Sequence, residues 1–153
     1  MKIINMPIIN LDNEEDFKKI FVEEFVNKEI SIESYIIKVY AEDFEHICYE
    51  YAEGNKYKKK FSLRRARKLL VIREICCGNI PYILIHQIER ENKSVCALCE
   101  SAEFAMFLVP KTSDKGNYFR LGTIIAYGKQ VESKIEKQKS GGKLIKTIEE
   151  VFE

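Results

Sequence analysis

The spacing of hydrophobic residues changes along the chain, and each change predicts a different kind of element. Asp12 and Asn13 are good helix caps, and the apolar residues after them recur at helical spacing: Phe17, Ile20, Phe21 and Phe25. They predict a helix over residues 13–27. The segment 34–40 is dense in β-branched and aromatic residues and predicts an extended piece.

A second helix is predicted from the cap residue Ser62 to Cys77, where a glycine and a proline follow. Its apolar residues fall on one side and its basic residues on the opposite side, so one face is expected to pack on a sheet. Arg73 interrupts the apolar side. Its guanidinium should either reach the edge of that face or meet a buried anion.

The chain then changes to four apolar runs separated by charged or glycine-containing turns: 82–89, 94–100, 103–110 and 118–127. Such runs predict an antiparallel meander. A charged helix over 129–139, a hinge at 140–142 and a short helix over 144–152 are expected to follow. The order predicts an α+β fold with two N-terminal helices, a four-stranded antiparallel meander sheet and a C-terminal helix.

Composition narrows the class of protein. The chain has 153 residues, of which 46% are hydrophobic, so a single domain with a continuous core is expected. No apolar run is long enough to span a bilayer, and the first ten residues, broken by Asn5 and Pro7, are unlike a secretory signal. Five cysteines without an export signal favour a reducing compartment, and we expect a cytoplasmic protein without a membrane partner.

Charge is segregated although the net charge is only +1. Residues 12–24 are rich in acids, whereas residues 56–68 contain none. Basic groups in this arrangement suit a phosphate backbone. The predicted nucleic-acid-binding residues are Lys58, Lys59, Lys60, Arg67, Lys68 and, after the last strand, Lys129. A solubilising helix face explains the same pattern equally well.

His46 is the first candidate for chemistry, because an imidazole exchanges protons near neutral pH. It is predicted to lie on a half-buried extended segment, with Glu50 placed to orient the ring. The alternative is a structural histidine in the core, which is the commoner role. His86 lacks basic neighbours on its own strand and is predicted to be structural.

Two further patterns carry chemistry. Strict alternation along 118–127 places the hydroxyls of Thr123 and Tyr127 on one face, where they can bond a phosphate, although both residue types also simply favour strands. Cys96 and Cys99 have the CxxC spacing of a zinc site, with Cys76 or Cys77 as a third ligand. Small buried thiols explain the cysteines better, so neither a metal nor a cofactor is expected.

The order of these parts resembles a known superfamily. HICYE, then FSLRRARKLL opening a helix, a proline after it and a meander ending in GTIIAY are similar to the phage and polymorphic-toxin nucleases of the barnase/EndoU/colicin/RelE-like (BECR) fold. The resemblance covers residues 43–139 as the nuclease core, leaving 1–42 as an N-terminal helical extension and 140–153 as a tail or helix. Relatives often carry a tryptophan near Val71, and this chain has none.

The resemblance implies a ribonuclease that cleaves RNA without a metal, through attack of a ribose 2′-hydroxyl on the adjacent phosphate. It assigns His46 as base or acid, Arg64 or Arg65 to the phosphate charge and Thr123 to a hydrogen bond, with Tyr127 and Lys129 as further candidates. It also implies a phage-encoded or toxin-type effector acting on tRNA or mRNA, with an acidic immunity or antitoxin protein as partner. The alternatives are a non-catalytic nucleic-acid-binding module and an interaction protein whose basic helix docks an acidic partner.

Overall fold

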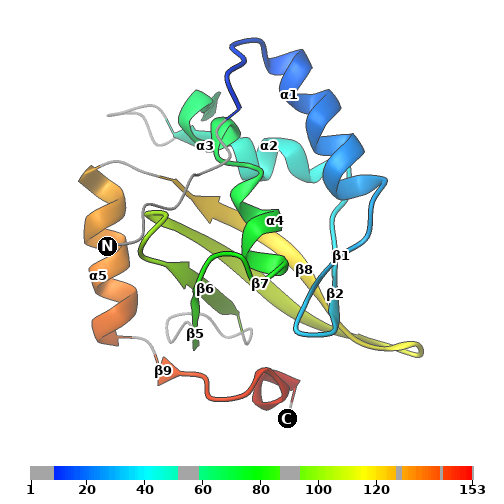
Figure 1. Cartoon of the computed structure of the whole chain (residues 1–153), viewed down its shortest axis with the longest axis vertical. Helices are drawn as coiled ribbons and strands as arrows, with labels where there is room; N and C mark the ends of the chain where they lie inside the picture. Colours follow the sequence, from blue (N-terminus) through cyan, green and yellow to red (C-terminus); the bar gives the residue numbers. More distant parts are fainter. Residues whose placement is uncertain (1–8, 52–58, 87–93, 127–128, 142, 153) are drawn as a thin grey trace.

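A seven-stranded mixed sheet carries the fold, in the order β1-β2-β8-β7-β6-β5-β9 (Figure 1). The computed structural model describes residues 9–51, 59–86, 94–126, 129–141 and 143–152. The strands of this sheet are β1 Ile30–Ile32, β2 Tyr35–Lys38, β5 Ile83–His86, β6 Val95–Cys99, β7 Phe104–Ser113, β8 Gly116–Ile125 and β9 Lys143–Leu144. Strand β2 runs parallel to β8, and the other neighbouring pairs of the described sheet are antiparallel.

The α+β class is confirmed, but the prediction of a four-stranded meander sheet with two N-terminal helices is wrong. The four predicted runs do become β5, β6, β7 and β8, which lie side by side in that order. Three short strands extend this sheet at its two edges. Strand β1 has only three residues, and its hairpin turn has positive φ at Glu33 (46°) and Ser34 (80°), where glycine or asparagine is the usual sequence signal.

The helices are shorter than the sequence predicts. Helix α1 (Glu14–Phe21) continues into a π-helical turn (Val22–Val26), and the predicted cap is confirmed because Asn13 Oδ1 accepts a hydrogen bond from the Glu15 amide at 2.8 Å. The remaining helices are α2 Asp43–Cys48, α3 Leu63–Arg67, α4 Val71–Cys76, α5 Lys129–Gly141 and a 3₁₀ helix Ile148–Phe152. None of the described helices is long and apolar enough to cross a bilayer.

The predicted helix over 62–77 is two helices, α3 and α4, with turns between them at residues 68–70. Ser62 caps α3 as predicted, accepting a hydrogen bond from the Arg65 amide at 3.4 Å. Arg73 on α4 meets an anion, since its guanidinium forms an ion pair with Glu24 in the π-helical turn. The π-helical turn and α4 are thus joined by an ion pair.

The main core lies between one face of the sheet and the helices in front of it (Figure 1). Phe17, Phe21 and Phe25 of the N-terminal helix are at most 2% exposed. Their rings meet aromatic residues of later segments, with ring centroids 5.8 Å apart for Phe17 and Phe61 and 5.5 Å apart for Phe21 and Phe44. The first helix therefore contributes to the same core as the sheet.

A smaller cluster of buried residues covers the opposite face of the sheet: Ile85, Cys96, Leu98, Ala105, Phe107 and Ile125. Because side chains alternate along a strand, Cys96 points into this cluster whereas Cys99 points into the main core. Two thiols on opposite faces of one strand cannot bind the same ion. The CxxC zinc site considered from the sequence is therefore wrong.

A β-bulge interrupts the pairing of β7 with β8. Phe107 pairs with Thr123 and Leu108 pairs with Leu121, so Gly122 is an extra residue on β8. Because neighbouring residues of β7 face opposite ways, Leu121 and Thr123 lie on opposite faces. The predicted strict alternation along 118–127 is therefore wrong, and Thr123 shares a face with Arg120.

Candidate functional site around His46

Helix α2 carries the candidate histidine and replaces the extended segment that the sequence predicts. Phe44, Ile47 and Cys48, at helical spacing, are at most 3% exposed and join the main core. Glu45 and His46 point away from the core and are exposed. The alternative of a core histidine is thus contradicted. The chain becomes extended only after α2, in β3 (Tyr49–Tyr51), which pairs with β4 (Lys59–Phe61).

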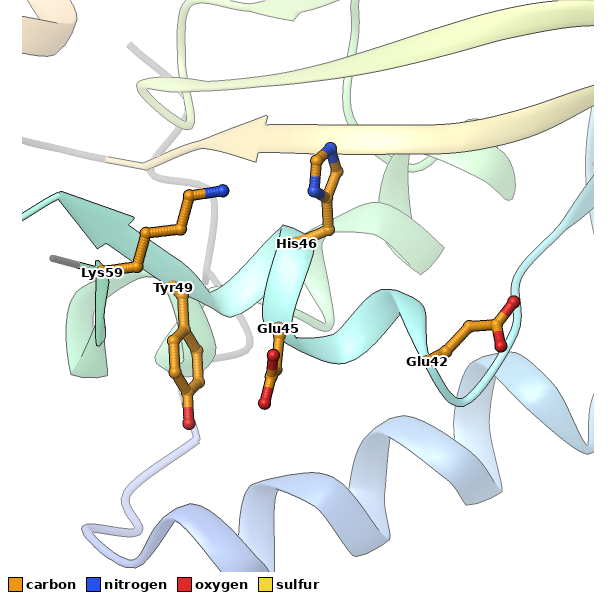
Figure 2. A pocket seen from close by; sticks show the side chains of 5 residues that line it. All are labelled: Glu42, Glu45, His46, Tyr49 and Lys59. Atoms are coloured by element: carbon orange, nitrogen blue, oxygen red, sulfur yellow. The ribbon is translucent and has the colours of Figure 1, made fainter. Parts of the chain in front are cut away.

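An open pocket of about 360 Å³ lies on this side of α2, lined by Glu42, Glu45, His46, Tyr49 and Lys59. Figure 2 shows the imidazole of His46 pointing from α2 toward β8, and the ammonium of Lys59 extending in the same direction from β4. Tyr49 and Glu45 point the other way, toward α1. The pocket is thus lined by an imidazole, a cation and two carboxylates, of which the Glu45 carboxylate points away from the imidazole. We call it the His46 pocket.

The structure places Thr123 next to the backbone of His46, and the resemblance assigns both residues to the reaction. Strand β2 pairs with β8 only at Phe119 and Arg120, and α2, which follows β2 in the chain, contacts β8 at Arg120 and Thr123. The hydroxyl of Thr123 donates a hydrogen bond to the backbone carbonyl of His46 at 3.2 Å. Thr123 therefore contacts the backbone that carries the imidazole, and its hydroxyl oxygen remains an acceptor.

Tyr49 is tied to the N-terminal helix, a contact that the sequence gives no reason to expect. Its hydroxyl lies 2.8 Å and 3.0 Å from the two carboxylate oxygens of Glu14 on α1. Because the neutral hydroxyl donates to a carboxylate, this hydrogen bond raises the pKa of Tyr49 to about 12. Tyr49 thus stays protonated at neutral pH, and its hydrogen bond connects the edge of the pocket to α1.

Arg64 and Arg65 do not line the His46 pocket, although one or the other is predicted to stabilise the charge on the phosphate. Glu50 engages both, with its carboxylate 2.9 Å from Arg64 Nη2 and 3.5 Å from Arg65 Nε. Burial acts to raise the pKa of Glu50, but the two guanidiniums outweigh it and the pKa is lowered. The prediction that Glu50 orients His46 is therefore wrong.

The guanidinium of Arg65 holds the end of α2. Its Nη1 donates hydrogen bonds to the carbonyls of Ile47 at 3.4 Å and Tyr49 at 3.1 Å, and its side chain is only 16% exposed. A cation suits this position because the last carbonyls of a helix have no partner within it. Arg65 thus supports the backbone on either side of Cys48.

The predicted nucleic-acid-binding residues point to different partners. Lys59 lines the pocket with its ammonium 5.2 Å from the Tyr51 ring centroid, and Lys60 is exposed on the same strand. Arg67 pairs with Asp12 at 2.6 Å, and Lys68 donates to the carbonyl of Ala102 at 3.2 Å. Because the helix is broken at residues 68–70, these side chains do not form the continuous basic face that the sequence predicts.

Four other residues singled out from the sequence are not placed at the pocket by the described structure. Lys58 and Tyr127 lie outside the described residues, and Lys129 is the first residue of α5. His86, predicted to be structural, lies half-buried on β5, far along the sheet from β8.

Arg120 and Asp43 form an ion pair beside the pocket that sequence analysis missed. Arg120 Nη2 lies 2.9 Å from Asp43 Oδ1, while Asp43 Oδ2 accepts a hydrogen bond from the Tyr40 amide at 2.9 Å. The carboxylate of Asp43 is buried, so its two oxygens are satisfied by a cation and a backbone amide. The hydrogen bond to Asp43 raises the pKa of Arg120.

Comparison with protein-family models, with curated proteins and with solved structures finds no match. The fold and the site therefore define the class by themselves. The class is an α+β protein with an open pocket lined by an imidazole, an ammonium group and carboxylates, next to the part of β8 that β2 does not cover.

Proposed function

We propose that this protein is a metal-independent ribonuclease, which cleaves RNA by attack of a ribose 2′-hydroxyl on the adjacent phosphate. One observation carries the proposal. The exposed imidazole of His46 and the ammonium of Lys59 share a pocket of about 360 Å³ with the carboxylates of Glu42 and Glu45. A proton-transfer group, a cation and a second titratable group are the parts that this reaction requires.

The chemistry assigns a role to each part. A bond forms between the 2′-oxygen and phosphorus while the bond from phosphorus to the 5′-oxygen breaks, leaving a 2′,3′-cyclic phosphate and a 5′-hydroxyl. One group takes the proton of the 2′-hydroxyl and another gives a proton to the 5′-oxygen. His46 serves in one of these transfers, and Glu42 or Glu45 serves in the other after its exposed side chain turns toward the phosphate. Lys59 stabilises the charge that develops on the phosphate oxygens.

Two residues outside the pocket act as positioning residues. Thr123 donates its hydroxyl proton to the His46 carbonyl, and Arg65 holds the carbonyls of Ile47 and Tyr49. Together they fix the short helix α2, which by itself is too short to be stable. They support catalysis by holding the imidazole in place and need not touch the phosphate.

The biological role rests on the resemblance to the BECR-fold nucleases. It supports a phage-encoded or toxin-type effector that acts on tRNA or mRNA in the cytoplasm. An immunity or antitoxin protein would block the reaction by covering the His46 pocket, and an acidic group placed against Lys59 would suit that contact.

A second candidate is a nucleic-acid-binding module without catalysis. Its support comes from cations stacked on tyrosine rings at the surface, such as Lys38 with its ammonium 4.3 Å from the Tyr118 ring centroid. Aromatic rings and cations together bind single-stranded nucleic acid without any reaction. An interaction protein that docks an acidic partner has less support, because the predicted basic face is not continuous.

Incubation of the purified protein with RNA in EDTA separates the candidates. The ribonuclease should cleave with the metal removed and leave 2′,3′-cyclic phosphate ends. A binding module should retain RNA with an affinity that falls as salt rises, without any cleavage. An interaction protein should show neither activity. Cleavage that stops in EDTA and returns with added divalent metal would contradict the proposed mechanism.

A further inference from the structure

Two cation–aromatic pairs lie beside the His46 pocket, on the face of the sheet opposite the main core. The ammonium of Lys38 is 4.3 Å from the Tyr118 ring centroid, and the guanidinium carbon of Arg120 is 4.8 Å from the Tyr40 ring centroid. Lys38 on β2 and Arg120 on β8 are direct neighbours in the parallel pairing, so their side chains share a face. We call these four residues the aromatic track.

The track leads to the pocket. Tyr118 and Arg120 are two residues apart on β8 and face the same way. The bulge at Gly122 turns Thr123 onto this face too, and Thr123 is bonded to the backbone of His46. The five-residue distance from Tyr118 to Thr123 is about 17 Å at about 3.4 Å per residue. Sheets that bind RNA stack two or three bases on aromatic residues over such a length.

The aromatic track carries little uncompensated charge, which suits unstacked bases better than a ligand of dense negative charge. Arg120 is largely compensated, since Asp43 lies 2.9 Å and Glu42 lies 3.8 Å from its guanidinium. Lys38 forms no ion pair within the described part of the chain, and Tyr40 is 42% exposed. A cation without an ion pair among the described residues, beside one exposed ring and one half-buried ring, matches a strand whose bases are unstacked. A duplex offers dense charge, but its bases are already stacked inside it.

We propose that single-stranded RNA reaches the His46 pocket along the aromatic track, with bases stacked on Tyr118 and Tyr40 and a phosphate on Lys38. The direction of approach rests on the proposed ribonuclease function, because the strand is led toward the His46 pocket only if the reaction takes place there. Binding to the track itself requires no catalysis. The substrate class of the enzyme is then unpaired RNA, such as a loop or a single-stranded message.

Binding is measured with a fluorescent single-stranded oligonucleotide whose riboses are 2′-O-methylated, so that the attacking hydroxyl is blocked and cleavage cannot occur. Tyr118→Leu should weaken binding about tenfold, because it removes one stacking ring, whereas Tyr118→Phe should retain it. Lys38→Ala should weaken binding and reduce the slope of log affinity against log salt by about 0.7. Lys143→Ala is the matched control, since Lys143 lies on β9 at the other edge of the sheet.

The outcomes separate the track from the enzyme. Equal affinity for the single strand and for a duplex of the same sequence would overturn the track, as would equal losses in Tyr118→Leu and Tyr118→Phe. Cleavage of RNA by a protein whose binding ignores Tyr118 and Lys38 would overturn the track and leave the ribonuclease. Binding that follows the pattern above, in a protein that never cleaves RNA, would support the track and remove the ribonuclease.

Discussion

Replacing His46 with alanine should abolish most cleavage without disturbing the fold. Both the change in stability and the loss of cleavage rate can be given a magnitude. His46 is exposed on α2, and its imidazole has no hydrogen bond to any residue that the structure describes. The buried residues of the helix, Phe44 and Ile47, are untouched by the change. Alanine also favours a helix more than histidine does, by up to about 0.7 kcal/mol. The free energy of unfolding should therefore change by less than about 1 kcal/mol.

The loss of activity should be far larger than the change in stability. A positioned proton-transfer group contributes about 10² to 10⁴ in rate, which corresponds to about 3 to 5 kcal/mol of barrier. Binding of the 2′-O-methylated strand should be nearly unchanged, because the track does not include His46. Initial rates on a fluorescent RNA in EDTA measure the first effect, and urea unfolding measures the stability.

His86→Ala is the matched control, because it removes the only other histidine from a strand distant from the pocket. Its cleavage rate should equal that of the parent protein at a temperature where both are folded. A His46→Ala protein that cleaves RNA at the parent rate would refute the catalytic role. One that fails to fold would refute the conclusion that the histidine is a surface residue.

Two further predictions concern the surroundings of the pocket. Tyr49→Phe should lower the free energy of unfolding by about 1 kcal/mol near pH 8, because it removes the hydrogen bond to Glu14. The pKa of Tyr49 is about 12 in the folded protein and about 10 when unfolded, so the folded state binds more protons between these two pH values. The difference in the free energy of unfolding between the parent protein and Tyr49→Phe, measured in urea, should therefore shrink above about pH 10. A difference that stays constant with pH would argue against the hydrogen bond. A thiol reagent should label Cys77 rapidly and the other cysteines slowly, since Cys77 is the exposed one; rapid labelling of three or more, read by mass spectrometry, would contradict the packing. Burial raises the pKa to about 12 for three of the slow thiols, those of Cys48, Cys76 and Cys96.

Elements with a long and regular pattern could be predicted from the sequence. The cap at Asn13 and the phenylalanines after it define the first helix, and four apolar runs define β5 to β8. In these segments the intrinsic preference of the residues and the spacing of the buried positions indicate the same element, so either one is sufficient to predict it. The predicted helix over 129–139 is likewise confirmed as α5, which extends to Gly141.

Short elements could not be predicted, because their stability comes from contacts made elsewhere in the chain. Strands β1 and β9 have three and two residues, too few to show any period. The sequence favours an extended segment in place of α2, because this helix lies between two stretches rich in aromatic and β-branched residues, 34–40 and 49–51. The better signal was the spacing of Phe44, Ile47 and Cys48, three and four residues apart, which places them on one side of a helix.

The candidate site was predictable only in part, and the missing part depends on long-range contacts. The resemblance assigns His46 and Thr123 to the same reaction, and the structure places them in contact through a backbone carbonyl. The partner of Arg120 is 77 residues away in the chain, and that of Tyr49 is 35 residues away. Neither contact follows from spacing or composition, because each depends on how α2 sits between the sheet and α1.

The bulge at Gly122 explains why the sheet and the histidine helix can form one site. A β-carbon at this position would lie 3.2 Å from the carbonyl oxygen of Phe107, so glycine allows the two strands to approach closely there. If β8 alternated strictly through Gly122, without a bulge, Thr123 would face the main core, and of the two residues only Arg120 would remain on the open face. With it, both residues face the same side, and each bonds to α2. Bulges often redirect a side chain next to an active site, and here the redirected hydroxyl holds the backbone of the residue proposed to transfer the proton.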